Sequence, residues 1–316
     1  MPNFRVSILR ILALLIVVHA ALASMSLAGD KLALDAMVWV GGHWWRADQA
    51  GLARSEFAFE RVGAIAGLTG RLSPVASLRA SGDVSVLQPQ DLFVDLDWSS
   101  GLGLRAGQFV LPLGMDAMTE PDSQRLAGSS FLVGYAKPAG IRDVGVLGSW
   151  VRSSFSASAA LVNGTGPNAV DNNDRKDLCG RFTLRPLAAL DAVLALRAYY
   201  GWPGALDSVW RSAALEARLR RGPLELQAEF QNHLSQYAQN NMAYLQAVWD
   251  IGRLEPVGRF DLALPKGKRA EWMMTGGLNL RPVSDYLKVM FDCSYHRSDQ
   301  DNWGVFGFHL RLQAAL

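Results

Sequence analysis

The stretch from Arg211 to Gln231 reads R-S-A-A-L-E-A-R-L-R-R-G-P-L-E-L-Q-A-E-F-Q, and apolar residues alternate in it with charged or polar ones. The apolar positions are Ala213, Leu215, Ala217, Leu219, Leu224, Leu226, Ala228 and Phe230, and the charged positions between them include Glu216, Arg218, Arg220, Glu225 and Glu229. A period of two indicates β-strands, because successive side chains of a strand point to opposite faces. Gly222-Pro223 predicts a tight turn, so we expect a β-hairpin.

This hairpin has one apolar face and one charged face, which two kinds of protein share. A soluble antiparallel sheet buries its apolar face and turns the other face to water. A membrane barrel turns its apolar face to lipid and its polar face to a water-filled lumen. The rest of the sequence has to decide between the two.

The mature chain is expected to carry almost no net charge. The sequence of 316 residues has 31 Lys and Arg against 29 Asp and Glu, and the first 28 residues hold Arg5 and Arg10 but no acid. Removal of those residues leaves the two signs balanced, which argues against a nucleic-acid partner. Cys179 and Cys293 are the only cysteines, so neither a disulfide framework nor a cysteine-rich metal site is expected.

The first residues have the pattern of an export signal. Arg5 and Arg10 precede a short apolar core from Ile11 to Ala23, and small residues suited to cleavage end at Ala23 and Ala28. A core of about 13 residues falls short of the ~20 that a membrane-spanning helix requires. We therefore expect a signal peptide over residues 1–28 and a barrel domain over residues 29–316.

Alternating segments of about ten residues recur along the mature chain, and about sixteen strands are expected. One long segment, Glu56 to Leu72, slips in phase near Arg61, which predicts a bulge. Very short connections, such as Gly252-Arg253, alternate with longer polar ones. This asymmetry is typical of an up-and-down barrel with short periplasmic turns and longer outer loops. The sequence therefore favours an all-β fold, a transmembrane antiparallel barrel, over a soluble β-protein of the periplasm.

Several tryptophans lie near the predicted strand ends, where two interpretations stay open. They suit the aromatic girdles of a membrane barrel, or ordinary packing. These residues are Trp98, Trp150, Trp202, Trp249, Trp272 and Trp303.

The segment from Gly107 to Asp116 reads G-Q-F-V-L-P-L-G-M-D, and it is followed by R-D-V-G-V from Arg142 and N-G-T-G from Asn163. These motifs resemble the phosphate-selective porin O/P family of outer-membrane channels. The segment from Gly107 to Asp116 is similar to the family's G-Q-F-K-x-P-F-G segment, although Val110 replaces the usual Lys. The other similar stretches are R-D-V-G-V from Arg142, N-G-T-G from Asn163, the acidic run from Asp171 to Asp177, and the final L-R-L-Q from Leu310. The resemblance covers most of the mature chain.

The resemblance implies a sixteen-stranded channel, often a homotrimer, whose third outer loop folds into the lumen and narrows it. The longest irregular segment, Pro112 to Ile141, follows the fifth predicted strand, where such a loop would lie. Long loops without regular structure are uncommon in compact domains unless they serve a function. The charges of this segment are Asp116, Glu120, Asp122, Arg125 and Lys137.

Rings of charged side chains set the ion selectivity of a pore, so the charges predicted to face inward are the candidate site residues. On the strands the basic candidates are Arg79, Arg105, Arg181, Arg185, Arg197, Arg218, Arg220, Arg259, Lys288 and Arg311, and on the loop the candidates are Asp116, Glu120, Arg125 and Lys137. An equal number of inward acids is expected on the strands. Two interpretations stay open: a transverse field across the pore, or a solvated wall whose charges pair across strands. Because the signs are mixed, we expect weak selectivity.

No catalytic or metal-binding motif is recognisable, and no cofactor is expected. The sequence lacks a G-x-S-x-G elbow and an H-E-x-x-H pair, and the run from Asp171 to Asp177 lacks the ligand order of an EF-hand. The favoured hypothesis is a porin in the outer membrane of a Gram-negative bacterium, in contact with lipid. It would let small hydrophilic solutes or ions diffuse, with anions such as phosphate among the candidates. The alternative is a barrel without transport, such as an adhesin, a structural protein or an enzyme at the rim.

Overall fold

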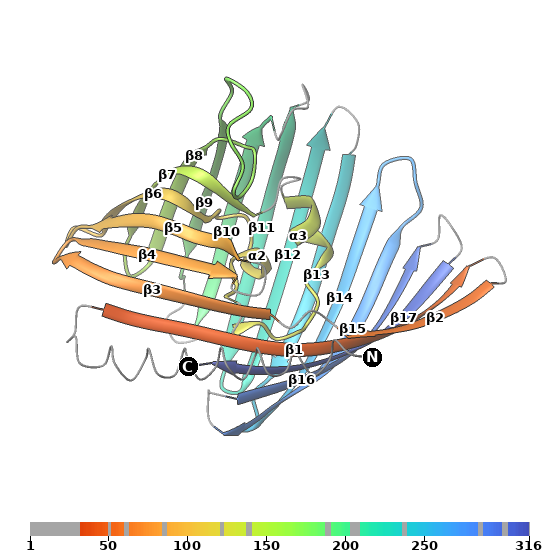
Figure 1. Ribbon diagram of the computed structural model, residues 1–316. Helices are drawn as coiled ribbons and strands as arrows, with labels where there is room; N and C mark the ends of the chain where they lie inside the picture. The colour runs from red at the N-terminus through yellow and green to blue at the C-terminus, as the bar shows by residue number, and fades with distance from the viewer. Residues whose placement is uncertain are drawn as a thin grey trace.

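The computed structural model describes residues 32–49, 52–59, 63–83, 87–120, 123–136, 141–186, 191–202, 209–235, 239–283, 287–298 and 303–315, and the predicted signal peptide lies outside them. The described strands form one antiparallel sheet (Figure 1). In chain order they are β1 (Leu32–Gln49), β2 (Leu52–Phe59), β3 (Gly63–Ser73), β4 (Ala76–Asp83), β5 (Gln88–Asp97), β6 (Leu102–Val110), β7 (Arg142–Val151), β8 (Phe155–Val162), β9 (Asp177–Leu184), β10 (Ala192–Gly201), β11 (Trp210–Arg221), β12 (Leu224–Ser235), β13 (Gln239–Trp249), β14 (Leu254–Pro265), β15 (Glu271–Val283), β16 (Leu287–Ser298) and β17 (Trp303–Ala315).

The sheet closes on itself, because the first strand pairs with the last. Residues 37–48 of β1 pair with residues 304–315 of β17, and from β3 to β17 each strand pairs with the next one in the chain. On its other edge β1 pairs with β2 over residues 42–49 and with β3 over residues 32–39. Since β2 and β3 lie end to end along one neighbour, they are two parts of one wall strand, and the barrel has sixteen strands. The predicted strand number is confirmed. Arg61, near which the phase slip is predicted, lies outside the described residues.

The two faces of the wall differ as the alternation predicts. On β11 the even-numbered Ser212, Ala214 and Glu216 are buried on the inner side, whereas Leu215 on the outer side is 57 % exposed. The partner strand β12 repeats this pattern, with Glu229 inside and Phe230 outside. The closed ladder satisfies the backbone hydrogen bonds, and the apolar band faces outward, as a lipid environment requires.

The connections divide into two ends of the barrel. Short turns at residues 74–75, 98–101, 152–154, 222–223 and 250–253 share one end, called here the turn end. The opposite end, the loop end, carries the long connection between β6 and β7 and the one between β8 and β9. Trp98, Trp150 and Trp249 are exposed at the turn end, and Trp202 and Trp272 lie at the loop end. Trp303 begins β17 at the loop end.

The connection between β6 and β7, called here loop L3 (residues 111–141), carries two short helices, α2 (Met115–Met118) and α3 (Phe131–Ala136). Both helices lie within the ring of strands (Figure 1), and α3 packs against β12, β13 and β14. Where loop L3 begins and ends, the N–H of Leu111 donates to the carbonyl of Ile141 at 2.8 Å. Neither α2 nor α3 has the length or the apolar composition to cross a membrane. The loop therefore folds into the barrel, as the resemblance implies.

Candidate functional site: the lumen and loop L3

Carboxylates of the barrel wall accept hydrogen bonds from backbone amides of loop L3. Glu229 on β12 accepts from the N–H of Met115 at 3.3 Å, where α2 begins. Asp261 on β14 accepts from Phe131 at 3.2 Å, where α3 begins. Asp292 on β16 accepts from Ala127 at 2.5 Å. Because free amides at a helix start attract negative charge, Glu229 and Asp261 hold the loop at the points where its helices need partners, and Asp292 holds the segment between the two helices.

Cations of the wall donate to backbone carbonyls of the same loop. Arg259 on β14 donates to Gly128 at 3.0 Å, and Arg311 on β17 donates to Ala127, also at 3.0 Å. Lys288 on β16 donates to the carbonyl of Gln124. These three are among the predicted pore-lining residues, and Arg259 and Lys288 are buried beneath the loop. In the structure these three residues anchor loop L3 to the wall. Their role in ion selectivity stays a prediction.

Apolar side chains of loop L3 fill two inward-facing apolar patches of the wall. Leu126 packs with Val248 and Val257, and Leu132 packs with Met242 and Tyr244. Apolar residues facing the inside of a barrel would otherwise meet water, so their burial under the loop contributes to its position. The sequence pattern alone did not predict these inward apolar positions.

A buried ion network crosses four strands beside the start of α2. Arg181 on β9 donates to Glu216 at 2.6 Å, and Arg197 on β10 lies between Glu216 (3.4 Å) and Glu229 (2.5 Å). Arg197 also donates to Gln231 at 2.6 Å. The Arg197 side chain is 0 % exposed. Since buried charges are tolerated only when paired and hydrogen-bonded, this network ties strands β9 to β12 together under loop L3.

A second cluster centres on Glu255 of β14, which is buried. Arg125 of loop L3 and Arg281 of β15 both donate to its carboxylate, the latter at 2.7 Å. Asn279 donates to the other carboxylate oxygen at 2.8 Å and also to the carbonyl of Arg125 at 2.8 Å. The predicted loop cation Arg125 therefore lies inside the barrel, with its charge balanced by a wall acid.

A polar cavity of about 370 Å³ lies between loop L3 and the wall of β9 to β14. Five arginines line it together with two acids; these are Arg125, Arg181, Arg218, Arg220 and Arg259, with Asp116 and Glu225. Three of the arginines pair with wall carboxylates, because Arg125 contacts Glu255, Arg181 contacts Glu216 and Arg259 contacts Asp261. Arg218 contacts Asp191, an acid that is itself largely exposed.

The remaining predicted residues lie elsewhere around the barrel. Arg105 on β6 pairs with Asp95 at 2.7 Å and stacks over Phe93 at 3.8 Å. Arg79 is half-buried on β4, Arg185 is exposed just past β9 at the turn end, and Glu120 is exposed on loop L3. Lys137 lies outside the described residues. The structure thus brings together Arg125, Arg181, Arg218, Arg220 and Arg259 and leaves Arg79 and Arg105 on the opposite arc.

Two buried acids at the loop end were not among the predicted site residues. Asp143 on β7 accepts from the N–H groups of Gly164 (2.9 Å) and Gly166 (3.3 Å). Asp177 on β9 accepts from the N–H of Trp202 at 2.7 Å and from the hydroxyl of Tyr199. These bonds fasten the connection between β8 and β9, called here loop L4 (residues 163–176). The N-G-T-G motif and its neighbouring acids were the signal in the sequence.

The described residues hold no group of three His, Cys, Asp or Glu side chains placed to bind a metal ion. Cys179 is buried on the inner side and Cys293 lies on the other face of its strand, and the structure shows neither of them in a disulfide.

The fold is that of solved outer-membrane porins. An anion-selective porin from Comamonas acidovorans superposes with a TM-score of 0.69 at 14 % identity, over 90 % of this chain and 100 % of that one. OprB of Pseudomonas putida gives 0.75 at 8 % identity, over 92 % and 96 %. OmpF of Salmonella typhi gives 0.71 at 10 % identity, over 91 % and 98 %.

No protein-family model and no curated protein matches the sequence. The similarity to solved structures shows that the chain has the sixteen-stranded porin fold. Because no family model matches, membership of the phosphate-selective porin O/P family stays a prediction. At such low identities the passage of a particular solute has to be argued from this chain's own residues.

Proposed function

We propose that this protein is a porin of the outer membrane of a Gram-negative bacterium, through which small hydrophilic solutes diffuse passively. The observation that carries the proposal is the combination of an apolar outer wall, a charged inner wall and a loop anchored inside the barrel. Sixteen strands enclose a lumen wide enough for water. A loop held against the wall narrows that lumen, so solute size is expected to limit passage.

The position of loop L3 favours a constriction over a complete plug. Its anchors come from one arc of the wall, β12 to β17, through contacts such as Asp261–Phe131 and Asp292–Ala127. The polar cavity beside the loop is lined by charged side chains on both sides. Water and ions find charged and polar partners along such a surface, whereas an adhesin or structural barrel has no need of it.

We infer a weak preference for anions. Arginines outnumber acids around the cavity, but pairing with Glu255, Glu216 and Asp261 neutralises three of them. Most of the remaining positive charge comes from Arg220 and Arg218, toward the turn end of β11, because the pair of Arg218 with Asp191 is exposed to solvent and screened. A cavity with a small surplus of one sign favours the opposite ion only weakly, and more weakly still at high salt.

Reversal potential in a salt gradient tests this preference. The wild-type channel should show a small potential of the sign for anion preference, and the double variant Arg218→Gln/Arg220→Gln should move it toward cations. Arg46→Gln, an exposed cation on the outer face of β1, serves as the control and should leave the potential unchanged. An unchanged potential in the double variant would contradict the role given to these two arginines.

Liposome swelling tests passage itself. Vesicles that hold the folded protein should swell in uncharged sugars at rates that fall steeply as the sugar becomes larger. Uptake of monosaccharides and large oligosaccharides at the same rate would contradict a constriction by loop L3.

Assembly into a homotrimer is part of the proposal, and chemical cross-linking of the protein in membranes tests it.

A further inference from the structure

Two tryptophans of β1 lie on the inner face of the barrel. Direct partners across an antiparallel pair share a face of the sheet, and Val40 pairs with Leu312 of β17, both exposed on the outer wall. Trp39 and Trp45 are an odd number of residues from Val40, so their side chains point to the opposite, inner side. Arg311, the neighbour of Leu312 in β17, also points inward, because it donates to loop L3 inside the barrel.

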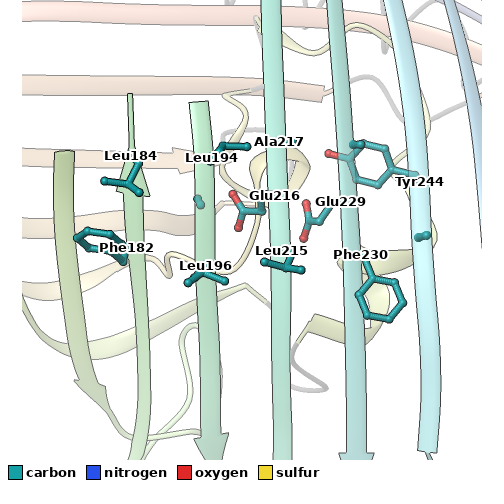
Figure 2. Close-up of a pocket in the computed structure, with 13 residues that line it drawn as sticks. Phe182, Leu184, Leu194, Leu196, Leu215, Glu216, Ala217, Glu229, Phe230 and Tyr244 are labelled. Carbon is teal, nitrogen blue, oxygen red and sulfur yellow. The ribbon is translucent and has the colours of Figure 1, made fainter. Parts of the chain in front are cut away.

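Elsewhere the inner face carries polar side chains, or aromatic rings that the chain covers. Figure 2 shows β9 to β13, where the leucines and phenylalanines of the outer wall alternate with Glu216 and Glu229. Tyr199 is buried in the apolar cluster at the start of loop L3, and Tyr244 is buried against Leu132 of the same loop. Loop L3 therefore shields these two rings from the water of the lumen.

Trp39 and Trp45 are not covered in this way. Both are partly exposed, and within the part of the chain that the structure describes neither indole stacks on another ring or on a cation. Trp44, on the outer face of the same strand, instead contacts Phe306 and Phe308 at ring-centre distances of 6.2 and 6.5 Å. A large apolar ring turned toward water is unfavourable. Two such rings on the lumen side therefore indicate a surface that a solute covers.

The two indoles are the ends of a row of rings along β1. Alternate residues of a strand are about 6.6 Å apart, so the distance from Trp39 to Trp45 is about 20 Å. His43 lies between them on the same face, and its ring centre is 6.0 Å from that of its partner His309 on β17. These four residues are called here the aromatic row. Glu56 of β2, the direct partner of Trp45, is exposed beside it.

The aromatic row runs past the edge of loop L3. The loop is held on β17 by Arg311, and β1 is the next strand of the wall (Figure 1). Arg311 pairs directly with Gly41, which follows Trp39 on the same face of β1. Trp45 lies nearer the loop end, where β17 begins. A solute that enters from the loop end therefore meets Trp45 first and reaches Trp39 beside the constriction.

We propose that the aromatic row binds uncharged sugars inside the channel, with the sugar rings against the indoles and their hydroxyl groups on His43 and Glu56. The C–H groups on the face of a sugar ring match the negative face of an aromatic ring. Hydroxyl groups donate to a carboxylate and exchange hydrogen bonds with an imidazole. An organic cation also suits an indole beside a carboxylate, but it would meet the guanidinium of Arg311 at the level of loop L3. The proposal names a solute class for the porin proposed above and rests on that function.

The current through single channels in a planar bilayer, measured with increasing cellotriose, tests the proposal. The glucose rings of this trisaccharide carry only C–H groups on their faces. Bound sugar should block the current, and the double variant Trp39→Leu/Trp45→Leu should raise the half-blocking concentration about tenfold, because two stacking contacts are lost. The double variant Trp39→Tyr/Trp45→Tyr keeps a ring at both positions and should keep most of the block.

Trp44→Leu is the matched control, because it removes an indole from the outer face of the same strand and should leave the block unchanged. Heat-modifiable migration on gels shows that each variant is folded, and Trp45→Leu alone tests the row should the double variant not fold. An unchanged block in the inner variants, or no block of the wild type, would overturn the proposal. Block by choline without block by cellotriose would overturn the assignment to sugars.

Isothermal titration calorimetry of cellotriose into the protein in detergent micelles measures binding without any current. A silent bilayer, together with binding that Trp39→Leu/Trp45→Leu weakens, would contradict the proposed channel and support the sugar site. Open channels that cellotriose neither blocks nor binds would overturn the sugar site and leave the channel in place.

Discussion

At the scale of single residues, most charges of the inner wall are partnered. Arg105 pairs with Asp95, Arg142 pairs with Asp91, and Arg197 lies between two glutamates. Pairing across strands was one of the two interpretations that the sequence left open, and the other was a transverse field. The structure shows the pairs, so the charge available to a passing ion is smaller than a count of arginines suggests.

Arg197→Ala is expected to lower the free energy of unfolding by about 3–5 kcal/mol, because it leaves Glu216 and Glu229 buried without their shared cation. Urea unfolding of the protein in lipid vesicles, followed by tryptophan fluorescence, measures this. Arg218→Ala breaks an exposed pair and should cost about 1 kcal/mol or less. Equal effects of the two substitutions would contradict the burial of the network.

A left-handed glycine of loop L4 supplies a second prediction at this scale. Gly164 has φ +89°, and a Cβ added there would lie 2.6 Å from the Asp177 carboxylate. Gly222 of the β11–β12 turn has φ +58° but open space around it. Gly222→Ala should therefore cost only the ~1–2 kcal/mol of the left-handed backbone, and Gly164→Ala should cost more. Urea unfolding measures the loss of stability in both variants. An equal loss would show that the space between Gly164 and Asp177 tolerates a Cβ, which would contradict the prediction.

At the scale of elements, loop L3 is held by the wall through groups of both signs. Acids accept from its amides and cations donate to its carbonyls, so the charges that look like a pore lining also serve as anchors. Alternation in the sequence placed these residues on the inner face, but it carries no information on what covers them. The partner of Asp292 lies 165 residues away in the chain, and no local pattern can predict such a contact.

Asp292→Ala is expected to loosen loop L3 while leaving the barrel intact, because the N–H of Ala127 loses its partner. The open channel should then show larger current noise and more frequent brief closures in planar bilayers, with an unchanged β-sheet signal in circular dichroism. Asp97→Ala, at an exposed acid near the turn end, is the control. Noise that does not differ between the two variants would contradict the anchoring role of Asp292.

At the scale of the whole molecule, the barrel follows from the period-two pattern, and the faces of β11 and β12 agree with it residue by residue. The site was predicted less completely. Arg125, Arg181, Arg218, Arg220 and Arg259 do gather around one cavity, but their pairing depends on the register of distant strands. The hydrogen bonds of Asp143 and Asp177 that fasten loop L4 were not predicted, because in the sequence a buried acid inside a strand looks like any other inward polar residue.

The central claim is that this barrel is an open, constricted channel. Its most direct test is the current through single molecules of the purified, folded protein inserted into a planar lipid bilayer. The account predicts discrete conductance steps of uniform size. A bilayer that stays silent, although the inserted protein shows the heat-modifiable migration of a folded barrel, would contradict it.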